Sequence, residues 1–223
     1  MKKQFVLLIA LFFFFYLIKV NYVQAQSCNI KASISPITLN GKRLAEFLDH
    51  SNVDKLWLPH LHTDWYTGKQ NKPGWSLHAT YCSSFVASMA KRLHIKLLHP
   101  PEHPPKGLAS AQFDWLKNNG AKFGWKEVDF INAQNLANQG YFVVAVYKNP
   151  NPHKTGHIAI IRPSKRSIAD IELNGPEETQ AGSFNSLDTT VSQGFFHHPL
   201  AWKPCGEGSL VFFAHPIDFS KIN

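Results

Sequence analysis

The sequence is poor in charged residues and has no cluster of like charges. Charged side chains make up 17% of its 223 residues, and the formal net charge of +8 includes no run of lysine or arginine and no basic-aromatic repeat. Nucleic-acid-binding surfaces need such a patch, so we expect no nucleic-acid partner. Internal repeats and low-complexity segments are also missing, which favours one globular domain.

Long apolar runs are missing too, apart from one near the beginning. It extends from Phe5 to Ile18 and has 14 residues, fewer than the roughly 20 that a membrane-spanning helix needs. Two lysines precede it and small residues follow it at Val23-Gln24-Ala25. This pattern predicts a cleaved signal peptide over residues 1–25, and hence a secreted or periplasmic protein that meets the membrane only through this segment. An uncleaved anchor is the alternative.

Cysteine is scarce, with Cys28, Cys82 and Cys205 as the three residues. An odd number in an exported chain predicts one disulfide and one free thiol. Cys28 lies near the expected mature start and Cys205 lies near the end, in a loop rich in turn-forming residues. Because the termini of a domain are often close in space, we expect Cys28 to pair with Cys205 and Cys82 to stay free. Three unpaired thiols are the alternative.

Helical patterns dominate the first half of the chain and strand patterns the second. Short helices are predicted over 39–48, 108–116 and 133–138. Strands are predicted over 141–147, 156–163, 178–181 and 209–214. A proline-rich stretch over 97–105 predicts a rigid, extended connection without helix or strand. A polar stretch over 164–175 predicts a second connection. This order predicts an α+β fold with an antiparallel sheet.

A further helix is predicted to begin at Cys82. Cap-forming residues surround the cysteine, and apolar residues follow at the spacing of one buried helical face, at Phe85, Val86, Met89 and Leu93. In the first turn of a helix, free N–H groups and the helix dipole favour a thiolate over a thiol. Cys82 is therefore a candidate nucleophile, and a small buried hydrophobic residue is the alternative.

A nucleophilic thiol needs a base, and the base needs a third polar group that orients it. His157 opens the predicted strand 156–163, and Gln180 lies on the next strand. An antiparallel pair would place these two residues side by side, and Cys82 would face His157 if its helix packs across the sheet. Asn185 is the alternative to Gln180, and a packed strand histidine is the alternative for His157.

Two motifs in this order resemble the NlpC-type and CHAP cysteine amidohydrolases, papain-like enzymes that cut peptidoglycan peptides. Tyr81-Cys82-Ser83-Ser84-Phe85-Val86 is similar to the start of their cysteine helix, and Gly156-His157-Ile158-Ala159-Ile160 is similar to their histidine strand. Thr179-Gln180-Ala181-Gly182 falls at the third position of the family. The likeness covers roughly residues 75–215. Ser84 departs from it, because the NlpC type usually has glycine there.

The resemblance implies a papain-like domain over 75–223, with N-terminal helices packed on an antiparallel sheet. Residues 26–74 then form an aromatic-rich N-terminal extension. The implied activity is that of a cysteine peptidase or amidase that cleaves an amide in peptidoglycan or another peptide, by a triad of Cys82, His157 and Gln180 and without a cofactor.

The resemblance also bears on substrate and partners. Three residues just before the nucleophile are the expected substrate-binding residues, namely Trp75, His78 and Tyr81. A basic domain suits anionic polymers such as cell-wall material. We expect a monomer, with a protein inhibitor as a further partner. The pair His197-His198 is predicted to lie in a surface loop.

Two other functions remain open at this point. A non-catalytic wall- or glycan-binding module could use an aromatic platform of Trp57, Trp65, Tyr66 and Trp75. A zinc hydrolase could use His60, His62 and Asp64, because alternate residues of an extended chain point the same way. The residues flanking this run differ from those of metallo-β-lactamase-type hydrolases, so a packed histidine pair is expected and no metal.

Overall fold

The computed structural model describes residues 28, 32–59, 63–67, 69 and 82–222. The chain divides into two units, 1–30 and 31–223, and the described helices and strands all belong to the second. The expected signal peptide lies outside the described residues. Within the described part of the chain, no helix combines the length and hydropathy that a membrane span requires.

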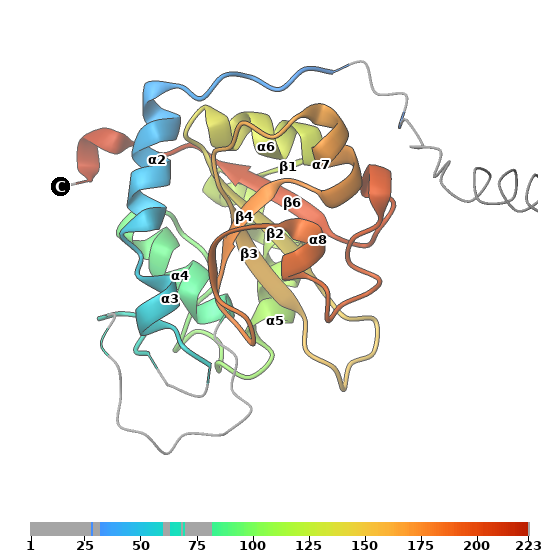
Figure 1. Ribbon diagram of the computed structural model, residues 1–223. Helices are drawn as coiled ribbons and strands as arrows, with labels where there is room; N and C mark the ends of the chain where they lie inside the picture. The colour runs from blue at the N-terminus through green and yellow to red at the C-terminus, as the bar shows by residue number, and fades with distance from the viewer. Residues whose placement is uncertain (1–27, 29–31, 60–62, 68, 70–81, 223) are drawn as a thin grey trace, which may run out of the picture. The chain divides into compact units, whose positions relative to one another are not determined.

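The second unit is built on one six-stranded sheet (Figure 1). Its strands are β1 (Lys126–Val128), β2 (Phe142–Tyr147), β3 (His157–Ile161), β4 (Glu177–Gln180), β5 (Ser186–Thr190) and β6 (Val211–His215). Their order is β1-β6-β2-β3-β4-β5, and every neighbouring pair is antiparallel. The meander from β2 to β5 brings the candidate histidine strand beside the candidate glutamine strand.

Helices surround this sheet. The described α-helices are α2 (Leu39–Asp49), α3 (Val53–Leu56), α4 (Cys82–Arg92), α5 (Leu108–Asn119), α6 (Phe130–Asn138), α7 (Ile168–Asn174) and α8 (Val191–Gly194). The described residues also include the short 3-10 helices η1 (Gly120–Phe123), η2 (Pro204–Gly206) and η3 (Phe219–Lys221). The fold is therefore α+β, with an antiparallel sheet, as the sequence predicts.

Two apolar cores lie on opposite faces of the sheet, because side chains alternate along a strand. Val144 and Val146 of β2 face a core shared with α2, α4 and α5. Val143 and Ala145 face the other core, shared with α6, α7 and α8. The same alternation governs β3, where successive residues contribute to different cores.

The described helices before α4 belong to the same core as the cysteine helix. Thr38 caps α2 by accepting a hydrogen bond from the Gly41 backbone N–H. Leu44 and Leu48 of α2 are fully buried against the core that contains α4. The described part of the aromatic-rich segment thus packs within the unit of residues 31–223.

The sequence prediction is wrong in the polar stretch 164–175, which contains helix α7. Ser167 caps this helix by accepting a hydrogen bond from the Asp170 backbone N–H, and only Ile171 is fully buried. Ile168 and Ile171 have helical spacing, but this apolar pattern is too short to predict a helix in an otherwise polar stretch. The short strands β1 and β5 were also not predicted, because their residues are largely polar. Segment 97–105 has no helix or strand, but it turns rather than extends.

Candidate functional site

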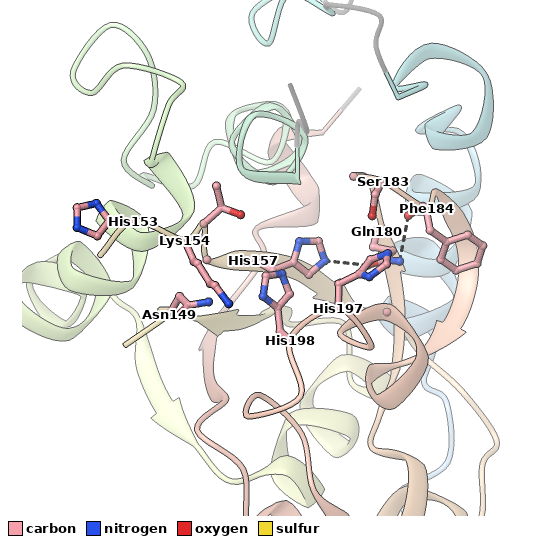
Figure 2. A pocket seen from close by; sticks show the side chains of 13 residues that line it. Asn149, His153, Lys154, His157, Gln180, Ser183, Phe184, His197 and His198 are labelled. Carbon is pink, nitrogen blue, oxygen red and sulfur yellow. Dashed lines mark hydrogen bonds between the residues drawn. The ribbon is translucent and has the colours of Figure 1, made fainter. Parts of the chain in front are cut away.

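A polar cavity of about 420 Å³ opens at the beginning of β3 (Figure 2). Its walls come from the β2–β3 connection, the end of β4 with the following turn, and the segment after α8. The residues that line it are Asn149, His153, Lys154, Thr155, Gly156, His157, Gln180, Gly182, Ser183, Phe184, Gly194, His197 and His198. Two of the three predicted catalytic residues, His157 and Gln180, are among them.

His157 is the first residue of β3 and is 8% exposed. Gly156 precedes it because a Cβ there would lie 2.4 Å from the Tyr147 carbonyl oxygen. The imidazole packs edge-on against Phe195, with ring centroids 4.6 Å apart. It also stacks on His198, with centroids 5.7 Å apart and an interplanar angle of 16°. The ring is therefore held between the sheet and the chain after α8.

The partner of His157 is Gln180 at the end of β4. Nε2 of His157 lies 2.8 Å from Oε1 of Gln180. The Gln180 amide nitrogen donates to the Phe184 carbonyl oxygen at 3.0 Å, which fixes the orientation of the amide. Because an amide oxygen only accepts, Nε2 of His157 must carry the proton. Its Nδ1 is then the unprotonated nitrogen, available as a base.

Burial lowers the pKa of His157 to about 4, although its hydrogen bond to Gln180 acts in the opposite direction. Loss of water disfavours the charged imidazolium more than the neutral amide oxygen stabilises it. The imidazole is consequently neutral near neutral pH. A neutral imidazole with a fixed tautomer is the state that a general base requires.

Cys82 begins α4, as the sequence predicts, and is 4% exposed. The Ile158 backbone N–H donates a hydrogen bond to its sulfur. The Arg162 N–H on the same strand donates to Glu177 of β4. Alternate N–H groups of β3 point the same way, so the Ile158 N–H points toward the β4 side, beyond the last residue of that strand. The Cys82 sulfur therefore lies next to the backbone N–H of Ile158, the residue that follows His157.

The expectation of a thiolate at Cys82 is not met. Burial raises the pKa of the Cys82 thiol, although hydrogen bonds from the Ile158 and Ser83 backbones and from the Ser83 side chain act in the opposite direction. The helix start supplies donors, but the surrounding apolar core disfavours a charge more strongly. Cys82 is therefore a neutral thiol that must lose its proton to a base in order to react.

The expectation that Cys82 faces His157 is not met, because the two side chains lie on different faces of β3. His157 shares its face of β3 with Ala159, toward α8, whereas Cys82 packs with Ile158 on the α4 side. Among the described residues, the thiol has no hydrogen bond with the imidazole, and Cys82 does not line the cavity. The structure brings His157 and Gln180 together and places Cys82 at the backbone next to them.

Asn185, the alternative to Gln180, contacts backbone atoms instead. Its amide nitrogen donates to the carbonyl oxygens of Val53, at 2.8 Å, and Trp57, at 2.6 Å. Its amide oxygen accepts from the Gly182 N–H at 2.8 Å. These bonds tie the turn after β4 to the end of α3, which is a structural role.

The pair His197-His198 was predicted to lie in a surface loop, and this is wrong for His198. Both residues line the cavity, and His198 is half-buried against the ring of His157. Burial lowers the pKa of His198 to about 4, and neighbouring His157 and His197 act in the same direction. Its position depends on packing after α8, for which the sequence has no local signal.

Glu178 was not predicted and lies behind the cavity. Its side chain is fully buried on β4, on the same face as Gln180, and neither carboxyl oxygen has a hydrogen-bond partner among the described residues. Burial raises the pKa of Glu178 well above the usual range. A Cβ added to Gly194 would lie 1.7 Å from Oε1 of Glu178, so α8 packs directly on this carboxyl group.

Of the described residues considered for an aromatic platform, Trp57 is not available at the surface. Trp57 is fully buried and packs edge-on against Phe85, with ring centroids 5.4 Å apart. Trp65 is half-buried and stacks on His99 at 4.4 Å, and Tyr66 is exposed beneath the Lys91 ammonium. Trp75, His78 and Tyr81, the expected substrate-binding residues, lie outside the described residues.

Of the residues considered for zinc, Asp64 is described. Its Oδ1 accepts hydrogen bonds from the backbone N–H groups of Tyr66 and Thr67, and from the Thr67 hydroxyl. This carboxylate stabilises a turn. His60 and His62 lie outside the described residues, and within the described part no group of three or more His, Cys, Asp or Glu side chains could hold a metal ion.

The cysteine pairing follows the sequence prediction. Cys28 and Cys205 are disulfide-bonded, whereas Cys82 is a free thiol. In comparisons with known proteins, no protein-family model and no curated protein matches the chain. The site is therefore interpreted from its own geometry.

Proposed function

We propose that this protein is an exported, papain-like cysteine amidohydrolase that cleaves an amide bond in cell-wall peptide. The observation that carries the proposal is the hydrogen bond between His157 and Gln180, which leaves Nδ1 of a neutral imidazole as a base. The Cys82 thiol lies at the amide of the next residue on β3. Because His157 is the first residue of β3, the proposal requires its ring to turn toward the thiol when substrate binds.

In the proposed reaction, Nδ1 of His157 takes the Cys82 proton as the sulfur attacks the amide carbonyl carbon. The backbone N–H of Cys82 and a neighbouring donor stabilise the oxyanion. The C–N bond then breaks, the imidazolium gives its proton to the leaving amine, and a thioester remains on Cys82. Water attacks the thioester while His157 takes a proton, which releases the carboxylate and regenerates the thiol.

The raised pKa of Cys82 and the lowered pKa of His157 indicate a neutral thiol and imidazole at rest. Proton transfer therefore accompanies attack, instead of preceding it as in an enzyme with a stable thiolate. Export is part of the proposal, and the disulfide supports it, because disulfides persist in oxidising compartments outside the cytosol.

Digestion of purified peptidoglycan tests the proposal. Residues 26–223 should release peptide fragments whose masses identify the bond, and Cys82→Ala should release none. A thiol-alkylating reagent should abolish the activity and a chelator should leave it unchanged. Fragments released equally by Cys82→Ala would exclude Cys82 as the nucleophile.

A further inference from the structure

The cavity beside His157 carries basic groups and no acidic ones. Its thirteen described lining residues include Lys154 and four histidines, but no aspartate or glutamate. Asn149, Thr155 and Ser183 add neutral hydrogen-bonding groups. A cavity lined in this way favours an anionic group over a neutral or cationic one.

The acid packed behind the cavity adds no opposing charge. Glu178 contacts Gly194, a lining residue, but its carboxyl group is fully buried. Burial raises the pKa of Glu178 well above its usual range, because the surrounding core disfavours a charged carboxylate. Glu178 therefore does not offset the positive charge of Lys154 in the cavity.

Lys154 itself has no acidic partner within the described part of the chain. Lys148, at the other end of the same β2–β3 connection, instead pairs with Asp114 at 2.6 Å. Figure 2 shows the Lys154 side chain directed into the cavity, toward His198. An unpaired ammonium group at this position can form a charge-assisted hydrogen bond with a carboxylate.

An apolar surface adjoins the polar cavity. Phe184, which lines the cavity, is 44% exposed, and Phe196 is 56% exposed. These two phenylalanines also line a neighbouring, mostly apolar pocket with Gln193. A ligand held at Lys154 could therefore place an apolar side chain against them.

We propose that this cavity binds a free carboxylate of the substrate, with Lys154 as its charge partner. The inference rests on the proposed function, because it places the carboxylate next to the substrate amide bond for whose cleavage His157 is the proposed base. The substrate is then a short peptide with a free carboxylate next to the scissile bond and an apolar side chain that contacts Phe184 and Phe196.

Soluble peptidoglycan fragments, used as they are or with their carboxylates converted to carboxamides by carbodiimide and ammonia, test this inference. The wild-type protein should cleave the unmodified fragments about tenfold faster or more, the value of one hydrogen bond to a charged group. Lys154→Met should lose this preference, and Lys154→Arg should retain it. Lys122→Met, which removes an equal charge at an exposed site outside the cavity, is the matched control.

Binding to the Cys82→Ala protein, measured by calorimetry with the same two fragment preparations, separates the two proposals. Tighter binding of the unmodified fragments that Lys154→Met abolishes supports the carboxylate site, even if no preparation is cleaved and the hydrolase proposal fails. Equal binding of both preparations, or no binding of either, overturns the inference. Equal cleavage of both by the wild type also overturns it while leaving the hydrolase intact.

Discussion

The hydrogen bond between Gln180 and His157 decides which imidazole nitrogen can act as the base. The Gln180 amide is oriented by the Phe184 carbonyl oxygen, and its own oxygen accepts from Nε2 of His157. A carboxamide orients the ring without adding the charge that a carboxylate would bring. The imidazole therefore stays neutral in a buried site, as its lowered pKa of about 4 indicates.

Replacement of Gln180 by alanine should allow His157 to adopt either neutral tautomer. We expect nitrogen chemical shifts of the imidazole to show an Nε2-protonated ring in the wild type and a tautomer mixture in Gln180→Ala. Activity should fall about 10- to 100-fold, because the base is no longer oriented. Asn185→Ala is the control, since Asn185 contacts only backbone atoms. A tautomer change in Asn185→Ala but not in Gln180→Ala would show that Asn185, and not Gln180, orients the imidazole.

Glu178 should make the protein less stable as the pH rises. Its folded-state pKa is raised by burial, so the unfolded chain loses this proton at lower pH than the folded one. Stability from this group is complete below its unfolded pKa and falls by about 1.4 kcal/mol per pH unit above it, until the folded pKa is reached. Glu178→Gln removes the titration and should be the more stable protein at about pH 8.

Urea unfolding between about pH 5 and pH 8 measures this difference. The gap in unfolding free energy between Glu178→Gln and the wild type should widen with pH. Glu46→Gln, at an exposed position of α2, is the matched control. A constant gap for Glu178→Gln would mean that Glu178 titrates alike in both states.

At the scale of elements, helix α8 packs over two side chains of β4, Glu178 and Gln180. A Cβ at Gly194 would lie 1.7 Å from Oε1 of Glu178 and 2.9 Å from Oε1 of Gln180. Gly194→Ala should therefore displace both side chains, lower stability by about 1–3 kcal/mol and weaken the Gln180–His157 bond. Ser192→Ala changes the same helix without adding an atom above β4. Thermal unfolding and the imidazole shifts would detect the effect, and unchanged shifts in Gly194→Ala would contradict this role of α8.

Elements with strong periodicity could be predicted from the sequence, and weakly patterned ones could not. The helix at Cys82 and the strand at His157 have continuous or periodic apolar residues, and both begin where the pattern places them. Strand β5 contains mostly polar residues and helix α7 has only a short apolar pattern, and they are stabilised by pairing and by a cap, respectively. Such elements depend on tertiary contacts that local sequence does not record.

For the whole molecule, the order of motifs predicted one of the two expected contacts of the site, between His157 and Gln180, but not the one between Cys82 and His157. Gln180 was placed beside His157 by strand order alone, and the structure has that contact. The charge state of Cys82 could not be predicted, because it depends on burial in a core formed by distant helices. His198 and Glu178 escaped prediction for the same reason, since only the folded sheet and α8 bring them to the site.

The central claim is that Cys82 forms a thioester with the substrate. The most direct test is to mix the wild-type protein with soluble peptidoglycan fragments, quench in acid, and measure the mass of the intact protein. We predict an added mass on the protein that equals the substrate minus the released amine and that a digest at acid pH locates on the Cys82 peptide, and neither adduct nor amine with Cys82→Ala. Amine released by Cys82→Ala at the wild-type rate, with Cys82 of the wild type unmodified throughout, would contradict it.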